Sequence, residues 1–268
     1  MNRPSVYSTT SARTQGICPK CGYRLSNFRT SARCFNCDYT ERGSDGPWST
    51  GATDQSLIWH AESIWDRADP FFQNEHKYRH AYEYLKQRRI FDLAVTCDQL
   101  RMAWGLNRVL NIRAYGSLLV GRIWHVRKGF VGIHVTRIEW NGWECERDER
   151  RTMGSCRGGA VWFGTVTPDT ELVVGEGIET TLSAMILWGA KAGAATLGTA
   201  GLESLVLPQA ARRVVIAADN DGPEPPHKVG IGLRAARKAR WLWQAEDPTI
   251  DVEIKLAPPP KPSEQKLE

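Results

Sequence analysis

The sequence predicts an α/β protein with a C-terminal parallel sheet, a mixed α+β middle region and a small N-terminal cysteine module. Three observations carry this prediction. After residue 170, buried-type strands alternate with helical segments, which is typical of a parallel sheet with helices on both faces. Residues 57–168 combine a helical pattern with a later β pattern. Four of the seven cysteines lie within residues 18–37.

Composition and charge limit the class of protein. The chain has 268 residues, of which 41% are hydrophobic and 24% charged, as in an ordinary soluble protein. No apolar run approaches the ~18 residues of a membrane helix, and the polar N-terminus lacks the apolar core of a signal peptide. We therefore expect a cytoplasmic protein with no membrane partner. The net charge is +5 and its basic excess precedes residue 169, which weakly favours a polyanionic partner.

The first half of the chain divides into five segments. Residues 1–16 are expected to be a flexible leader, 17–41 a compact module, and 42–56 a linker rich in Gly, Ser and Thr. Residues 57–91 have a helical pattern that Pro70 must break into two helices. Residues 116–140 predict an antiparallel hairpin that turns at Gly129. A charged, glycine-rich segment follows, before a strand at 160–163.

The second half reads as strands and helices in alternation. Residues 171–177 predict a buried strand, and residues 178–190 a helix. Strands are expected again at 192–199 and 212–221, then a long helix at 232–246 and a last strand at 251–258. Residues 259–268 are proline-rich and predict a loose tail. The domain boundaries that follow are 57–168 for the middle region and 169–258 for the C-terminal sheet.

The cysteine module has the spacing C-x2-C-x12-C-x2-C. Each C-x-x-C pair places two sulfurs on one tight turn, and two such turns complete a tetrahedron around Zn²⁺. The ligands would be Cys18, Cys21, Cys34 and Cys37. Lys20, Arg24 and Arg33 lie beside them among aromatic residues, a mixture that can pair with phosphates and stack on bases. An iron centre, a redox dithiol and a protein-docking zinc ribbon remain alternatives.

Acidic residues follow two strands of the predicted parallel sheet. Glu176 lies between two glycines at the end of the first strand, and Glu179 comes one helical turn later. Asp219 and Asp221 end the strand RRVVIAADND and, two residues apart, point to the same side. Such clustered carboxylates repel one another unless a cation lies between them, and Mg²⁺ prefers oxygen ligands. A plain turn and an acidic helix start are the simpler explanations for each motif alone.

These motifs resemble the Toprim domain, a Rossmann-like parallel sheet shared by DnaG-type primases, topoisomerases and some nucleases. The likeness covers about residues 169–258 and lies in GEGIET and AADND. It implies that Glu176 acts with the metal and that Asp219 and Asp221 bind Mg²⁺ or Mn²⁺. Glu179, one helical turn after Glu176, could support them from the same rim. A zinc ribbon, a mixed middle domain and then Toprim is the order found in DnaG-type primases. The middle region also resembles primases of phages, plasmids and integrated elements.

One departure from the primase pattern concerns the metal count. The resemblance implies a further acidic cluster shortly after the last strand, where this sequence reads APPPKPSEQKLE. The sequence therefore predicts one well-held cation, and a second is in doubt.

Basic residues gather before the acidic motifs. Arg137, Arg147, Arg150, Arg151 and Arg157 surround a strand and a glycine-rich turn. If they fold against the acids, they could hold a template or a nucleotide triphosphate through charge-assisted bonds. Pairing with Glu144, Glu146, Asp148 and Glu149 on a solvated surface explains them equally well.

The resulting hypothesis is a DNA primase, a nucleotidyltransferase that makes RNA primers on single-stranded DNA for replication of a mobile element. It would use nucleoside triphosphates and a helicase supplied by another chain. Two alternatives stay open. A Toprim nuclease would use the same acids to cut DNA, and a non-catalytic zinc-dependent loading factor would bind DNA without turnover.

Overall fold

The computed structural model describes residues 26–27, 31–33, 40–42, 52–71, 76–104, 116–220 and 229–256. The chain forms two compact units, Met1–Gly51 and Ala52–Glu268. The first unit contains an antiparallel sheet of β1 (Ser26–Asn27), β2 (Ser31–Arg33) and β3 (Thr40–Arg42). The four cysteines predicted to bind zinc lie outside the described residues, so the zinc ribbon stays a prediction.

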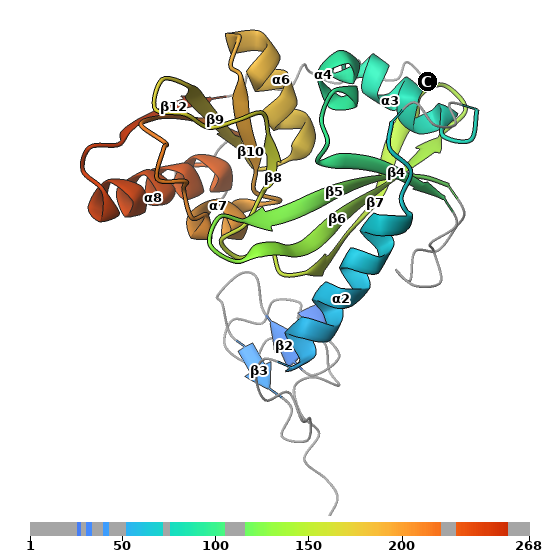
Figure 1. Ribbon diagram of the computed structural model, residues 1–268, viewed down its shortest axis with the longest axis horizontal. Coiled ribbons are helices and arrows are strands. Elements are labelled where there is room, and N and C mark those ends of the chain that lie inside the picture. Colours follow the sequence, from blue (N-terminus) through green and yellow to red (C-terminus); the bar gives the residue numbers. More distant parts are fainter. Residues whose placement is uncertain are drawn as a thin grey trace, which may run out of the picture. The chain divides into compact units, whose positions relative to one another are not determined.

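The second unit begins with a four-stranded antiparallel sheet (Figure 1). Its strands, in spatial order, are β4 (Leu100–Trp104), β5 (Ser117–His125), β6 (Gly129–Trp140) and β7 (Cys145–Gly154). The hairpin predicted over 116–140 is confirmed as β5 and β6, and it turns at Gly129, whose φ is +77°. Glycine adopts this left-handed conformation without steric cost, which explains the turn.

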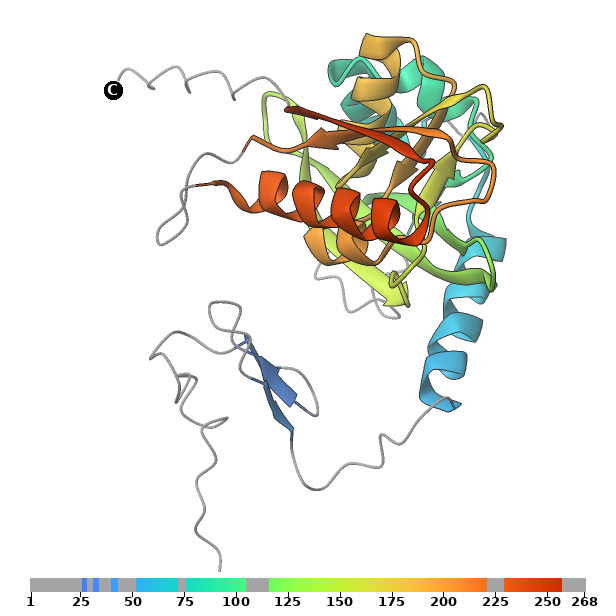
Figure 2. The same cartoon turned by 90° about the vertical axis from the view of Figure 1, so that its left-hand side faces the viewer.

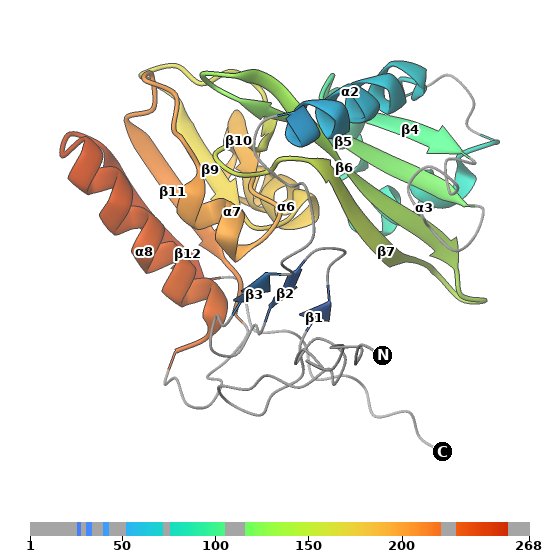
Figure 3. The same cartoon turned by 90° about the horizontal axis from the view of Figure 1, so that it is seen from below.

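Helices cover both faces of this sheet. They are α2 (Ala52–Arg67), α3 (Arg79–Gln87) and α4 (Phe91–Val95). Helix α2 lies against one face (Figure 3), and its Ile64 and Trp65 share a hydrophobic cluster with Val120, Ile133 and Val135. The other face carries α3 and α4. The predicted break near Pro70 is confirmed, because α2 ends at Arg67 before the proline.

A five-stranded sheet follows, and it confirms the α/β class with a Toprim-like parallel sheet. Its strands are β8 (Val161–Phe163), β9 (Glu171–Gly175), β10 (Ala192–Ala195), β11 (Arg213–Ala218) and β12 (Asp251–Leu256). The spatial order is β12-β11-β9-β10-β8, in which β8 alone runs antiparallel to its neighbour. Buried apolar side chains fill β9 and β10, as both faces of such a sheet are covered.

Three helices enclose this sheet from its two sides (Figure 2). They are α6 (Ile178–Trp188), α7 (Thr199–Ser204) and α8 (Ile231–Glu246). Leu182 and Met185 of α6 belong to one hydrophobic core, whereas Leu202 of α7 and Trp243 of α8 belong to another. The sheet therefore lies between α6 on one face and α7 with α8 on the other, as the alternation predicts.

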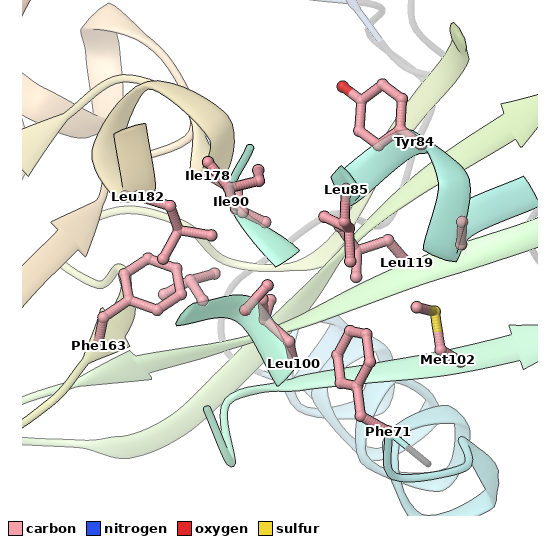
Figure 4. Close-up of a cluster of buried hydrophobic side chains, with 14 of the residues drawn as sticks. Phe71, Tyr84, Leu85, Ile90, Leu100, Met102, Leu119, Phe163, Ile178 and Leu182 are labelled. Atoms are coloured by element: carbon pink, nitrogen blue, oxygen red, sulfur yellow. The ribbon is translucent and has the colours of Figure 1, made fainter. Parts of the chain in front are cut away.

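One hydrophobic core joins the two sheets (Figure 4). Ile178 and Leu182 of α6 share it with Ile90 and Leu119 from the middle region and with Phe163 of β8. Strand β8 precedes residue 169 in the chain, yet it pairs with β10. The segments 57–168 and 169–258 thus differ in strand topology but are packed around a common interior.

The charged segment before β8 differs from its expected form. Residues 145–154 form strand β7, where the sequence predicts only a charged, glycine-rich segment. Strand β7 lies at an edge of the sheet, and most of its side chains are exposed, so it lacks the apolar alternation that marks a half-buried strand. No helix among the described residues is both long and apolar enough to cross a membrane.

Candidate active site

Two of the predicted acids follow neighbouring parallel strands. Strand β9 ends at Gly175 and α6 begins at Ile178, so Glu176 lies in the joint between them. Asp219 directly follows β11, whose Ala217 pairs with Gly175. Parallel sheets bind their ligands at the carboxyl ends of their strands. The topology therefore places Glu176 and Asp219 side by side at the edge where a ligand is expected.

Gly232 shows how closely the two acids approach each other. A Cβ on Gly232 would lie 3.1 Å from Oε1 of Glu176 and 3.3 Å from Cβ of Asp219. It would also lie 2.9 Å from the backbone oxygen of Asp219. Gly232 belongs to the first turn of α8, so a helix N-terminus faces both side chains. The partial positive charge of that terminus stabilises carboxylates.

The donors of this site fit a magnesium-type cation. Mg²⁺ is commonly held by one or two carboxylates, with water and substrate phosphates as further ligands. Glu176 and Asp219 supply two carboxylates. Asp221 lies outside the described residues, and within them no three His, Cys, Asp or Glu side chains converge as a complete metal cage. The described part of the site is thus an open arrangement of hard oxygen donors.

A cavity of about 600 Å³ opens beside the acids. Glu176 and Asp219 line it from the parallel sheet, and Arg88, Arg147 and Arg150 line it from the middle region. Carboxylates and guanidinium groups thus share one polar space. This arrangement suits a ligand that carries both a metal-bound and an arginine-bound anionic group, such as a polyphosphate.

A β-bulge directs two of these arginines into the cavity. In the ladder between β6 and β7, Ile138 pairs with Arg147 but Arg137 pairs with Glu149, so Asp148 is an extra residue. Strand residues normally alternate between faces. The bulge shifts that alternation by one residue, and Arg147 and Arg150, three apart in sequence, both reach the same cavity.

Glu179 is held by residues of the middle region. The hydroxyl of Tyr84 donates a hydrogen bond of 2.7 Å to Oε1 of Glu179, and Nη1 of Arg147 lies 3.6 Å from the same oxygen. Burial, followed by the charge of Glu179, raises the pKa of Tyr84 above its ordinary value of 10, so the phenol stays a donor. Glu179 therefore ties the start of α6 to α3 and β7.

We expect Tyr84→Phe to lower stability by about 1–3 kcal/mol, because it removes a hydrogen bond from a largely buried carboxylate. Urea unfolding at pH 7 measures this loss. The raised pKa means that this stabilisation is complete below pH 10 and declines as the pH rises further. Activity should also fall, since the start of α6 leads directly from Glu176.

Tyr78→Phe is the matched control. Tyr78 is also buried, and its hydroxyl donates to Asp69, which does not line the acidic cavity. This variant should lose stability while it keeps its affinity for metal and its activity. Equal losses of activity in both variants would contradict a specific role for the Tyr84–Glu179 bond.

The turn after β10 fixes the backbone of Glu176. The N–H of Gly198 donates to the carbonyl of Glu176 at 2.9 Å, and the N–H of Thr196 donates to the carbonyl of Gly175 at 2.9 Å. Between them, Leu197 has φ +66°, a conformation that is costly for a branched side chain. Leu197 and Gly198 both line the cavity. Backbone strain of this kind is found at sites where geometry matters for function.

His134 lies on β6 and lines the same cavity. Its Nδ1 is 3.0 Å from the hydroxyl of Thr152. Burial lowers the pKa of His134 to about 4; the charge of Glu179 opposes this shift, and the charges of Arg150 and Arg147 add to it. The ring is therefore neutral at pH 7, and it adds a hydrogen-bonding group to the cavity without adding charge.

The other predicted basic residues lie elsewhere. Arg137 is 5% exposed, and its guanidinium forms ion pairs with Glu139 and Asp148, so it joins β6 to the bulge. Arg151 pairs with Glu149 at 2.6 Å, and Arg157 is exposed beyond β7. Arg33 belongs to β2, but its side chain is not described, and Lys20 and Arg24 lie outside the described residues.

Several residues of the cavity carry no signal in the sequence. Arg88 lines the cavity and Tyr84 holds Glu179 beside it, yet both lie on or just after α3, far along the chain from the acids, and only tertiary packing brings them there. Gly232 and the turn at Leu197–Gly198 are different. The turn lies between β10 and α7, and Gly232 lies in the first turn of α8, both next to the acidic motifs. Glycines near the ends of strands and helices are therefore the sequence signal for these positions.

Comparison with known families identifies the C-terminal part of the chain. Residues 171–260 match the family model described as the Toprim domain, and this segment contains both acids and all four parallel strands. This part of the chain is therefore a Toprim domain. Comparison with curated proteins gave no match.

Solved structures of primases resemble the fold at a distance. A DnaG catalytic core is 14% identical, with a TM-score of 0.47, over 75% of this chain and 72% of that one. A DNA primase domain from Pseudomonas aeruginosa is 14% identical, with a TM-score of 0.47, over 75% and 71%. A DnaG primase catalytic domain bound to ssDNA is 13% identical, with a TM-score of 0.44, over 78% and 75%.

Proposed function

We propose that the protein is a DNA primase, which makes RNA primers on single-stranded DNA by metal-dependent nucleotidyl transfer. The observation that carries this proposal is the cavity in which Glu176 and Asp219 of the Toprim domain face three arginines of the middle region. A site for a nucleoside triphosphate needs both the acids and the arginines. The acids hold the cation that accompanies the phosphates, and the arginines hold the phosphates themselves.

The residues of the chain have distinct tasks in this proposal. Glu176 and Asp219, joined by Asp221, would hold Mg²⁺ or Mn²⁺. When bound, the cation neutralises phosphate charge and helps to lower the pKa of the attacking 3′-hydroxyl. Arg147 and Arg150 would orient the triphosphate by charge-assisted hydrogen bonds, since both guanidinium groups reach the cavity from one strand. Glu179, bound by Tyr84, keeps the start of α6 in place.

The decisive experiment is template-directed primer synthesis by the full chain. The reaction contains single-stranded DNA, the four ribonucleotides and Mg²⁺, with an otherwise identical reaction in EDTA. Short oligoribonucleotides that depend on template and metal support the proposal. Metal-dependent nicking of a plasmid without primer synthesis would favour a Toprim nuclease. Binding of DNA with neither activity would favour a loading factor.

The N-terminal cysteines give a separate prediction. We propose that Cys18, Cys21, Cys34 and Cys37 bind one structural zinc ion and that Lys20, Arg24 and Arg33 of this module contact single-stranded DNA. Purified protein should then contain about one zinc per chain by elemental analysis. Cys34→Ser should lose the zinc, because a tetrahedral site needs all four ligands, whereas Cys97→Ser should retain it. Iron or no metal in the native protein would contradict this assignment.

The proposal also includes the biological setting. The primers would serve replication of a mobile element such as a phage, plasmid or integrated element. A replicative helicase supplied by another chain would deliver the single-stranded template. Stimulation of primer synthesis by a helicase encoded on the same element would test this part.

A further inference from the structure

Arg137 is a buried cation of the middle sheet that does not line the acidic cavity, although the sequence suggests it as a phosphate-binding residue. Its guanidinium group donates through Nη1 to Glu139 on its own strand and through Nη2 to Asp148 on β7. Within the described part of the chain its Nε has no hydrogen-bond partner. These two carboxylates therefore neutralise a charge that is 5% exposed.

Asp148 is the extra residue of the bulge between β6 and β7. Ile138 pairs with Arg147 and Arg137 pairs with Glu149, so Asp148 has no partner in the ladder. Its carboxylate instead bonds Arg137, the residue of β6 beside the bulge. A bulge inserts one unpaired residue at some point along a ladder, and an ion pair to that residue fixes the point.

The position of the bulge decides which face of the sheet Arg147 and Arg150 occupy. Residues three apart in a regular strand lie on opposite faces. Only a bulge between the two arginines puts both on one face, where both line the acidic cavity. A shift of the bulge past either arginine would move that side chain to the other face, because a slip of one residue reverses the alternation.

A second cavity shows the same alternation farther along the ladder. Its volume is about 490 Å³, and it is lined by Arg79, His80, Glu83 and Gln87 of α3 with Trp140 and Cys145. The last two are a ladder pair, on the face that also carries the arginines of the acidic cavity. Asp148 lines neither cavity, because it bonds Arg137 on the opposite face. Its influence on a ligand must therefore be indirect.

We propose that Arg137 and Asp148 are positioning residues for the nucleoside triphosphate. Their ion pair holds the bulge between Arg147 and Arg150 and so keeps both guanidinium groups in the acidic cavity before the ligand binds. Donors that are already in place bind a charged group more tightly than donors that must first be ordered, because less conformational freedom is lost on binding. The inference deepens the proposed function and rests on it for the identity of the ligand.

The two partners of Arg137 provide matched variants. The side chains of Asp148 and Glu139 are 41% and 39% exposed, and each bonds one nitrogen of Arg137. Asp148→Asn weakens the pair that joins β6 to β7, whereas Glu139→Gln weakens the pair within β6 and leaves the bulge attached. Each variant removes one negative charge beside the same cation. An effect on stability or on charge alone would therefore be similar in both.

Isothermal titration calorimetry of the full chain with ATP and Mg²⁺ measures the effect. Asp148→Asn should weaken ATP binding by about 3- to 30-fold, within the range of coupling between neighbouring residues. Glu139→Gln should stay within about twofold of the wild type. Thermal unfolding of both variants checks that they remain folded. Unchanged ATP binding by Asp148→Asn, or an equal loss in the two variants, overturns the inference.

Deletion of Asp148 gives a second test with the opposite sign. Without this residue the ladder needs no bulge, since every remaining pair of β6 and β7 can stay as it is. Arg147 and Arg150 would then be two apart and face the same side by ordinary alternation. The deletion protein should bind ATP within about threefold of the wild type and more tightly than Asp148→Asn. A folded deletion protein that binds ATP as weakly as Asp148→Asn contradicts the positioning role.

ATP binding and primer synthesis separate this inference from the primase proposal. If no primers form but Asp148→Asn loses ATP affinity and Glu139→Gln does not, the primase proposal fails and the positioning role stands. If primers form and both variants bind ATP like the wild type, the positioning role fails and the primase proposal stands. A wild-type chain that binds no ATP in the presence of Mg²⁺ also overturns the positioning role.

Discussion

Replacement of Asp219 by asparagine is expected to reduce primer synthesis by at least about 100-fold, while the protein stays folded. The amide has the shape of the carboxylate but lacks its charge, so it binds a hard divalent cation poorly. Glu176→Gln should have a comparable effect, because Glu176 and Asp219 lie within 3.3 Å of one point beside Gly232. Product yield on a single-stranded template, resolved by electrophoresis, measures both losses.

The same two variants should lose activity without losing thermal stability. Without metal, two neighbouring carboxylates repel each other, so removal of one charge should leave the melting temperature in EDTA equal to or above that of the wild type. Mg²⁺ should raise the melting temperature of the wild type, as ligands that bind the folded state do, and raise that of Asp219→Asn much less. An Asp219→Asn protein with unaltered metal stabilisation would contradict the assignment of Asp219 as a ligand.

Gly232→Ala should be destabilising by about 1–3 kcal/mol and should reduce activity by about 100-fold. A glycine-to-alanine change inside a helix normally stabilises it by about 0.5–1 kcal/mol, so the expected sign is reversed. The reason is the contact of 2.9 Å that the new Cβ would make with the backbone of Asp219, together with 3.1 Å to Glu176. Both acids would have to move, and phosphoryl-transfer geometry tolerates little displacement.

Gly116→Ala is the matched control for this prediction. A Cβ on Gly116 meets no atom closer than 3.4 Å, which is ordinary contact, and Gly116 lines neither cavity. This variant should retain its stability and its activity. Guanidinium unfolding and the primer assay, run on both proteins, distinguish displacement of the acids from a general effect of alanine. Full activity in Gly232→Ala would show that α8 does not constrain the acids.

The parts of the site that could be predicted from sequence are those set by local patterns. A buried strand that ends in glycine and glutamate places Glu176 at a sheet edge whatever the rest of the chain does. The same holds for Asp219 after β11. Arg88 and Tyr84 could not be predicted, since their position depends on the packing of α3 against a sheet that is remote in sequence. Local periodicity carries no information on such contacts.

The fold shows the same division. Strands and helices of the parallel sheet have the expected order because apolar runs and amphipathic helices alternate there. Strand β7 could not be predicted from its own side chains, which are mostly exposed. It is a strand because it pairs with β6. The predicted domain boundary at residue 168 also rests on a local change in residue pattern. It says nothing of β8, which lies before the boundary and pairs beyond it.

Helix α3 contributes to both cavities, and this has a thermodynamic consequence. Arg79 and Glu83 lie at one cavity, whereas Tyr84 holds Glu179 and Arg88 lines the other. A ligand that shifts the helix at one end changes the site at its other end. By linkage, any strengthening of nucleotide binding by a ligand of the second cavity must be matched by an equal strengthening of the binding of that ligand by nucleotide. The eight residues between Arg79 and Arg88 would then couple the two cavities.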